Sequence, residues 1–232
     1  HIREIKQNIK GNKMSRLIDE INKYKEAFKQ KAPKEIQEMM LEATKKLENS
    51  SLSKNALTVG STAKEIKLPN ALGNEVSLFK TLEENDFAVV SFYRGTWCAY
   101  CNLELKALQE RNEELKALGA KLIAVSPQSP DASLATKEKN ELEFEVLSDN
   151  SNVIAKQYGL VFSLAEELRP IYLSFGINLP ANNKEDSYEI PMPATYVINK
   201  NKEIIFSFID EDYTKRCEPQ DIIEVIKKAK NK

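Results

Sequence analysis

This 232-residue chain has few of the residues that several kinds of functional site require. Its single histidine is His1, so no Ser-His-Asp triad can form, and acid–base groups have to come from Tyr, Glu, Lys or water. Among its seven glycines there is no Gly-rich phosphate loop, so we expect no bound nucleotide or flavin. No apolar run approaches the roughly 20 residues that span a bilayer, so the sequence does not predict a membrane protein.

The chain also has almost no net charge and few cysteines. Lys and Arg number 34 against 35 Asp and Glu, so no overall field draws the chain to nucleic acid or anionic lipid. Three cysteines do not make a disulfide scaffold, which favours a reducing, cytoplasmic location. Because the sequence opens on His1, a signal could have been removed, or Met14 could be an internal initiator preceded by an extension over residues 1–13.

Two patterns with helical spacing lie before residue 50 and are separated by Ala32-Pro33. Their apolar members are Leu17, Ile18, Ile21, Tyr24 and Phe28, then Ile36, Met39, Met40 and Leu47. They predict a helical hairpin that packs on the main domain or on a second subunit. The polar stretch 49–55 predicts a linker. We therefore expect an N-terminal extension and hairpin over residues 1–56, and one redox domain over 57–232.

Strand and helix patterns alternate in the second part and predict an α/β fold with a mixed central sheet flanked by helices. Strands are expected near 65–68, 76–78, 87–93, 121–126 and 145–148, and helices over 98–118, 131–139 and 152–158. The segments 195–198 and 204–209 predict an antiparallel hairpin, followed by a helix from Pro219. Residues 162–191 form an insertion with helical character.

In the most informative segment, an apolar strand over 87–93 is followed by a helix whose first turn contains Cys98 and Cys101. Positive partial charge at a helix N-terminus stabilises a thiolate, and i, i+3 spacing brings two cysteines within reach of a disulfide. The pair therefore predicts thiol redox chemistry. A zinc site would need about four ligands, and only Cys217 and His1 remain, so we expect no metal. Cys217 itself is expected to be a passive, partly buried residue.

Longer motifs resemble a known family. They are Leu57-Thr-Val-Gly-Ser-Thr-Ala, Leu68-Pro-Asn-Ala-Leu-Gly-Asn-Glu-Val-Ser-Leu, Phe92-Tyr-Arg-Gly-Thr-Trp-Cys-Ala-Tyr-Cys-Asn-Leu-Glu-Leu, Pro191-Met-Pro-Ala-Thr-Tyr-Val-Ile and Asp212-Tyr-Thr-Lys-Arg. Together they are similar to the peroxiredoxin-like branch of the alkyl hydroperoxide reductase and thiol-specific antioxidant (AhpC/TSA) family. The resemblance implies a thioredoxin fold with an N-terminal helical hairpin. It also implies a cysteine that attacks a peroxide, becomes a sulfenic acid, and is returned to the thiol through a disulfide.

The resemblance gives the two cysteines different roles according to which relatives guide the alignment. Alignment with peroxiredoxins puts the peroxide-attacking cysteine at Cys101, and it puts Cys98, Arg94 and Pro193 where that family carries Thr, Pro and Arg. Analogy with thioredoxin instead makes Cys98 the attacking thiol and places a cis-proline at Pro193. Arg94 is expected either to supply a cation or to be a structural arginine.

The candidate substrate-positioning residues are Trp97, Tyr100, Arg94, Pro193 and Thr96, although Thr96 is also explained as a strand end. Trp97 would shield the pair from water, and Tyr100 stands where thioredoxins commonly have proline. The expected function is a thiol-based antioxidant oxidoreductase that reduces hydroperoxides through Cys98 and Cys101. It would need no resident cofactor, and its electrons would come from a thioredoxin-like or small-thiol donor.

Two other functions remain open from the sequence. One is a thioredoxin-like enzyme that exchanges disulfides with proteins and has little peroxidase activity. The other is an interaction module whose hairpin builds a homodimer, with the cysteines incidental.

Overall fold

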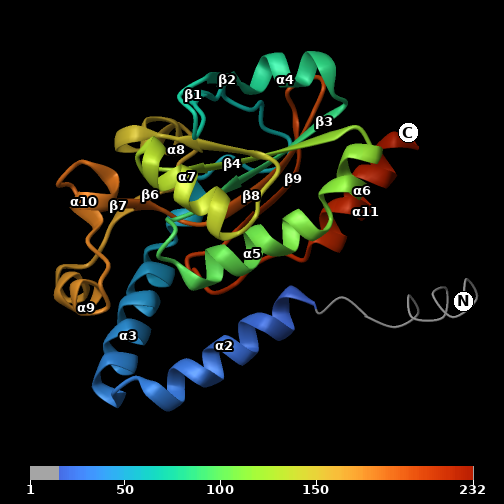
Figure 1. The fold of residues 1–232 in the computed structure, drawn as a ribbon. Coiled ribbons are helices and arrows are strands. Elements are labelled where there is room, and N and C mark those ends of the chain that lie inside the picture. Colours follow the sequence, from blue (N-terminus) through green and yellow to red (C-terminus); the bar gives the residue numbers. More distant parts are fainter. Residues whose placement is uncertain (1–15, 232) are drawn as a thin grey trace, which may run out of the picture.

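A five-stranded mixed sheet forms the centre of the molecule (Figure 1). The computed structural model describes residues 16–231, so the expected extension over 1–13 and Met14 lie outside the described residues. The strand order is β5-β4-β3-β8-β9, and β3, β4 and β5 run parallel while β8 and β9 are antiparallel. This confirms the predicted parallel core and antiparallel ending.

The elements follow the predicted order closely. The strands are β1 (Lys67–Pro69), β2 (Glu75–Ser77), β3 (Phe87–Phe92), β4 (Ala120–Ser126), β5 (Glu145–Ser148), β6 (Val161–Ser163), β7 (Glu189–Pro191), β8 (Ala194–Asn199) and β9 (Ile204–Ile209). The helices are α2 (Leu17–Lys31), α3 (Lys34–Ser50), α4 (Leu78–Glu84), α5 (Ala99–Glu110), α6 (Asn112–Ala117), α7 (Pro130–Lys139), α8 (Val153–Gln157), α9 (Arg169–Ser174), α10 (Leu179–Asn183) and α11 (Pro219–Lys230).

The central strands are buried on both faces, because alternate side chains enter two different apolar clusters. On β3, Phe87 and Val89 belong to the cluster that contains the apolar sides of α5 and α11. Ala88 and Val90 belong to the cluster on the opposite face, which includes residues of α4 and α8. A strand covered on both sides reads as a continuous apolar run, as the segment from Phe87 does.

Three local features differ from the sequence prediction. The second short strand ends at Ser77, and helix α4, which was not predicted, begins directly after it. Ser77 is the N-cap of this helix, because its Oγ accepts a hydrogen bond from Lys80 N at 3.1 Å. The single helix predicted over 98–118 is broken at Arg111 into α5 and α6. The insertion has the expected helices α9 and α10, and it also contains a β6–β7 pair.

The N-terminal hairpin extends along the side of the molecule on which α5 begins (Figure 1). Leu17 and Ile21 of α2 are buried in the same cluster as α5 and α11, and Tyr24 packs edge-on against Tyr100 with ring centroids 5.1 Å apart. Helix α3 packs against the insertion through Ile36, Met39, Met40 and Ala43. The boundary expected between residues 56 and 57 stays a prediction. The hairpin nonetheless lies against the start of α5, where the cysteines lie.

Candidate active site

Cys98 is the N-cap residue of α5, in the loop that follows β3. Its Sγ accepts a hydrogen bond from the backbone N–H of Cys101 at 3.4 Å. The loop is held by its neighbour Thr96, whose N–H donates to Gln128 Oε1 at 2.8 Å and whose carbonyl accepts from Asn102 Nδ2 at 2.7 Å. These bonds fix a cysteine sulfur against the unpaired amides of a helix N-terminus, where negative charge is stabilised.

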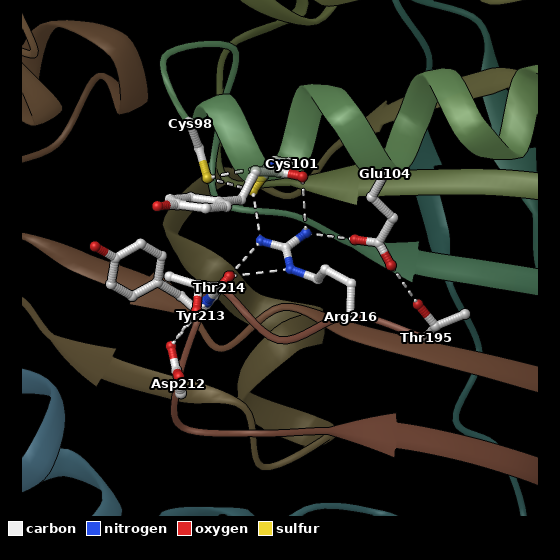
Figure 2. Close-up of polar contacts among 9 residues, drawn as sticks. Cys98, Cys101, Glu104, Thr195, Asp212, Tyr213, Thr214 and Arg216 are labelled. Carbon is white, nitrogen blue, oxygen red and sulfur yellow. Dashed lines mark hydrogen bonds and ion pairs between the residues drawn. The ribbon is translucent and has the colours of Figure 1, made fainter. Parts of the chain in front are cut away.

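The two thiols point toward one another (Figure 2). The Cys101 thiol donates to Cys98 Sγ across 2.7 Å, which is only about 0.7 Å longer than a disulfide bond. Both cysteines are buried, with Cys98 4% exposed and Cys101 0%. Little movement is needed to join the sulfurs, so the pair can form a disulfide within one helical turn.

A buried ion pair lies next to the Cys101 thiol. Arg216, between β9 and α11, donates from Nη2 to Cys101 Sγ at 3.3 Å and forms an ion pair with Glu104 (Figure 2). Glu104 also accepts a hydrogen bond from Thr195 Oγ1 at 3.0 Å. Burial raises the pKa of Glu104, although Arg216 opposes this shift by favouring the carboxylate. The charge of Arg216 is therefore largely matched by Glu104.

A second buried cation, Arg94, lies in the same pocket as Cys98. It is 2% exposed, and its guanidinium stacks on the rings of Tyr213 and Trp97 at 4.2 and 4.8 Å. It donates to the Tyr172 hydroxyl at 2.5 Å. Within residues 16–231 no carboxylate pairs with Arg94, and its Nε has no acceptor. Burial alone would lower the pKa of Arg94, but interactions with Tyr172 and Cys98 raise it instead.

The surroundings shift the two thiols in opposite directions. Burial alone would raise the pKa of Cys98, but the hydrogen bond from Cys101 and the charges of Arg94 and Arg216 lower it to about 5. Burial raises the pKa of Cys101 well above its ordinary value, and the hydrogen bond that it donates to Cys98 adds to the effect. Near neutral pH the pair is therefore a Cys98 thiolate that accepts a hydrogen bond from a Cys101 thiol.

A pocket opens over Cys98 and not over Cys101. Its empty volume, which includes space open to solvent at the mouth, is about 480 Å³. It is lined by residues of α2, α3, the start of α5 and the loop before it, α9 and the segment after it, and the loop between β9 and α11: Tyr24, Phe28, Met40, Arg94, Trp97, Cys98, Ala99, Tyr100, Tyr172, Phe175, Ile177 and Tyr213. The lining is mostly aromatic, with one cation and one thiol. A small molecule in this pocket would meet the Cys98 sulfur first.

The structure separates the candidate positioning residues into two groups. Arg94, Trp97 and Tyr100 lie in the lining of this pocket. Thr96 does not, since its hydroxyl bonds to Thr136 and to Ala132 O of α7 and so anchors the loop. Pro193 is also absent from the lining, and the prediction of a cis peptide bond there is wrong, because residues 16–231 contain none. The catalytic roles of these residues stay predictions.

Sequence reasoning did not assign a role to Arg216 or Glu104. Glu104 stands three positions after Cys101, so it shares a helix face with the thiol, and that spacing could have singled it out. Arg216 ends a motif already noted for its resemblance, but nothing in the local pattern points its side chain at Cys101. The rings of Tyr172 and Tyr213 in the pocket were likewise not anticipated.

Residues 16–231 provide neither a metal-binding cluster nor a second thiolate. Among residues 16–231 no group of three or more His, Cys, Asp or Glu side chains is arranged to hold a metal ion. Cys217 is 5% exposed, and burial raises its pKa, so it is a thiol rather than a thiolate. None of the described helices is both long and apolar enough to cross a membrane.

Comparisons with known proteins point to one family. The sequence model of the AhpC/TSA family matches residues 59–207. Peroxiredoxin Bcp of Escherichia coli is 28% identical over 106 residues, which is 46% of this chain and 67% of that protein. The chloroplastic peroxiredoxin Q of Sedum lineare is 31% identical over 113 residues, or 47% of this chain and 60% of that protein.

Solved structures show the same fold at low identity. Peroxidoxin BcpB of Mycobacterium tuberculosis superposes with a TM-score of 0.58 at 16% identity, covering 74% of this chain and 97% of that one. The reduced 2-Cys peroxiredoxin of Plasmodium vivax gives a TM-score of 0.57 at 17% identity, with coverage of 75% and 98%. These likenesses confirm the predicted thioredoxin-type fold.

Proposed function

This chain belongs to the AhpC/TSA family, and from that premise we propose that it reduces hydroperoxides through a reversible Cys98–Cys101 disulfide. It is an enzyme of the peroxiredoxin type that works through thiols. The observation that carries the proposal is the Cys98 sulfur, which lies in an aromatic pocket 2.7 Å from a second thiol and beside two buried arginines.

The reaction follows from the acidity of the two sulfurs. The Cys98 thiolate attacks one peroxide oxygen, the O–O bond breaks, and the other oxygen leaves as an alcohol or water after taking a proton. Arg94 and Arg216 are the nearby cations that stabilise the charge as it moves from sulfur to oxygen. Cys101 then loses its proton and attacks the Cys98 sulfenic acid, which releases water and closes the disulfide.

Assigning the first attack to Cys98 differs from the family alignment, which puts it on Cys101. Cys98 lines the pocket, whereas Cys101 does not. Cys98 also accepts hydrogen bonds from both the N–H and the thiol of Cys101. Cys101 receives one donor, Arg216, whose charge is already paired with Glu104. Access and charge therefore both favour Cys98 as the nucleophile and Cys101 as the resolving thiol.

Serine substitutions test this assignment. We expect the Cys101→Ser variant to react with hydrogen peroxide and retain a sulfenic acid on Cys98, which dimedone labels and peptide mass spectrometry locates. The Cys98→Ser variant should react no faster than an ordinary free thiol, because Cys101 is fully buried and does not line the pocket. Cys217→Ser is the matched control and should behave like the wild type. Rapid sulfenic acid formation in Cys98→Ser would give the first attack to Cys101.

One observation favours a second function. A pocket-facing first cysteine followed by a fully buried second one also suits attack on disulfides, as expected from thioredoxin. Against it, Cys98 is only 4% exposed beneath the hairpin and the insertion, which leaves little room for a protein disulfide. Reduction of insulin at a rate comparable with peroxide reduction would favour this second function.

The remaining parts of the proposal concern partners and location. The cycle needs two electrons from an external thiol donor, thioredoxin-like or small, and no resident cofactor. The low cysteine count and the need for a thiol donor support a reducing compartment such as the cytoplasm. A homodimer formed through the hairpin stays a prediction.

A further inference from the structure

Arg94 is a buried cation whose charge balance depends on the redox state of the site. In the reduced pair, the Cys98 thiolate and the Glu104 carboxylate face two arginines, Arg94 and Arg216. Closing the disulfide removes the thiolate charge and leaves the other three groups unchanged. Because Glu104 pairs with Arg216, the cation left without an anion is Arg94. An unpaired buried charge is costly, so the oxidised site favours an anionic ligand at Arg94.

No acid among residues 16–231 forms an ion pair with Arg94, although Glu211 lines a second cavity together with Arg94 and Tyr172. Glu211 and Asp212 lie close in sequence to Tyr213, but Glu211 accepts from Ser53 N at 2.8 Å and Asp212 accepts from Thr214 N at 3.0 Å. Neither carboxylate pairs with Arg94 in the described chain. The partners of Arg94 are instead the Tyr172 hydroxyl and aromatic rings.

Unused donors at Arg94 match a carboxylate. Arg94 is only 2% exposed, and its Nε has no hydrogen-bond acceptor within residues 16–231. The Tyr172 hydroxyl accepts from Arg94, which leaves its own proton free to be donated. A guanidinium N–H and a phenol O–H together suit the two oxygens of a carboxylate. Both residues line the pocket that contains Cys98, so an anion held there has Cys98 as a neighbour.

The molecule that meets the oxidised site is the electron donor. We propose that this donor is a small thiol bearing a carboxylate, which Arg94 and Tyr172 bind so that the donor sulfur reaches Cys98. This rests on the proposed Cys98–Cys101 cycle. The pocket is a narrow, mostly aromatic opening, and the cover formed by α2, α3 and the segment after α9 opposes the approach of a protein thiol.

The exchange balances with two donor molecules. The first donor thiolate attacks Cys98 Sγ, the protein S–S bond breaks, and its electron pair leaves on Cys101 Sγ, which takes a proton. A second donor thiolate attacks the donor sulfur of the mixed disulfide and releases Cys98 as the thiolate. Two donor thiols are oxidised to one donor disulfide, and the protein gains two electrons. Of the two donor protons, one stays on Cys101 and the other goes to solvent.

The test begins from the disulfide form, made with diamide so that it does not depend on peroxide. Reduction is followed through Trp97, the single tryptophan, which lies next to Cys98. The probes are 3-mercaptopropionate, 2-mercaptoethanol and cysteamine, compared as rates per concentration of thiolate. We expect 3-mercaptopropionate to exceed 2-mercaptoethanol by about 10- to 100-fold, the factor for one hydrogen bond to a charged group, and cysteamine to be slowest.

Two variants identify the residue. Arg94→Gln should bring the ratio of the carboxylate to the neutral thiol close to one. Arg169→Gln is the matched control, because Arg169 stacks on Tyr188 outside this pocket, and it should keep the wild-type ratio. If Arg94→Gln does not fold, competition by propionate or propionamide in the wild-type protein tests the same anion site. Propionate should then slow reduction of the wild-type disulfide by 2-mercaptoethanol, and uncharged propionamide should not.

Three results would overturn the proposal. They are equal normalised rates for the three thiols, a carboxylate preference that survives in Arg94→Gln, and faster reduction by reduced thioredoxin than by 3-mercaptopropionate at equal thiol concentration. Failure of the peroxidase function is detected separately, since stopped-flow oxidation of the dithiol by hydrogen peroxide uses neither donor nor diamide.

Discussion

At the scale of single residues, the site gives opposite properties to two cysteines one helical turn apart. Burial disfavours the charged form of both. The pKa of Cys98 is lowered in spite of burial, because Cys98 accepts a hydrogen bond from the Cys101 thiol and lies near two arginines. Donating the same hydrogen bond raises the pKa of Cys101 further. One proton is thus held between two sulfurs, and its position decides which of them is nucleophilic.

Alkylation of Cys98 by iodoacetamide should follow this acidity. In the reduced wild type we expect the rate to rise with pH through about 5 and to be level from about pH 6, because the thiolate is then fully formed. Iodoacetamide is uncharged, so binding of anions at Arg94 does not distort the profile. Peptide mass spectrometry after short exposures gives the rate at each cysteine.

The Arg94→Gln variant provides the comparison for this profile. Losing one cation should move the midpoint to higher pH, while Arg169→Gln should leave it unchanged. A wild-type midpoint at the ordinary cysteine value of about 8.5 would contradict the acidity described for Cys98.

At the scale of elements, helix α2 depends on a residue from the far end of the chain. Its own N-cap, Arg16, makes no capping hydrogen bond from its side chain. Glu218, the residue before α11, instead accepts from Leu17 N at 3.1 Å and Ile18 N at 2.8 Å. A carboxylate at a helix N-terminus satisfies unpaired amides and complements the helix dipole. The position of α2, and with it one wall of the pocket, therefore depends on this contact.

Replacing the carboxylate tests that dependence. We expect Glu218→Ala to lower the free energy of unfolding by about 1 kcal/mol, as for other lost caps, and to speed amide hydrogen exchange in α2 more than in the sheet. Urea unfolding and exchange mass spectrometry measure the two effects. Glu224→Ala, an exposed acid on α11, is the control and should change neither. Uniformly faster exchange across the whole molecule would show that Glu218 has no specific role at α2.

At the scale of the whole molecule, the Cys98 thiolate couples folding to pH. Cys98 is ionised above about pH 5 in the folded protein, but it stays protonated up to about pH 8.5 in the unfolded chain. Between these values the unfolded state binds more protons, so the contribution of Cys98 to stability rises with pH. It is fully present above about pH 8.5 and is lost as the pH falls through about 5.

The difference between the reduced wild type and Cys98→Ser isolates this contribution. We expect the free energy of unfolding of the wild type, relative to the variant, to increase between pH 5 and 8.5 by at most about 1.4 kcal/mol per pH unit. Urea titrations with a phosphine reductant present give both values. Cys217→Ser should track the wild type across this range, because Cys217 is a buried thiol and not a thiolate. A pH-independent difference for Cys98→Ser would mean that Cys98 is not ionised in the folded protein.

Much of the architecture follows from local sequence patterns. The continuous apolar run from Phe87 predicts a strand buried on both faces, and the helical spacing after Cys98 predicts the helix that carries both sulfurs. Smaller features were not predicted, such as helix α4, whose start depends on the hydrogen bond that Ser77 Oγ accepts from Lys80 N. The wrong prediction of a cis bond at Pro193 came from an analogy with thioredoxin, and nothing in the chain itself required it.

The sequence alone determined the strands of the central sheet, the family, and a thiol pair at a helix N-terminus, because each is encoded in short local motifs and side-chain patterns. Only the tertiary structure decided which sulfur is ionised and which faces the pocket. Those properties depend on Arg216, more than a hundred positions after Cys101, on Arg94, which has no carboxylate partner among residues 16–231, and on a hairpin that covers the site. Charge and access act through space, so a local pattern cannot specify them until the chain has folded.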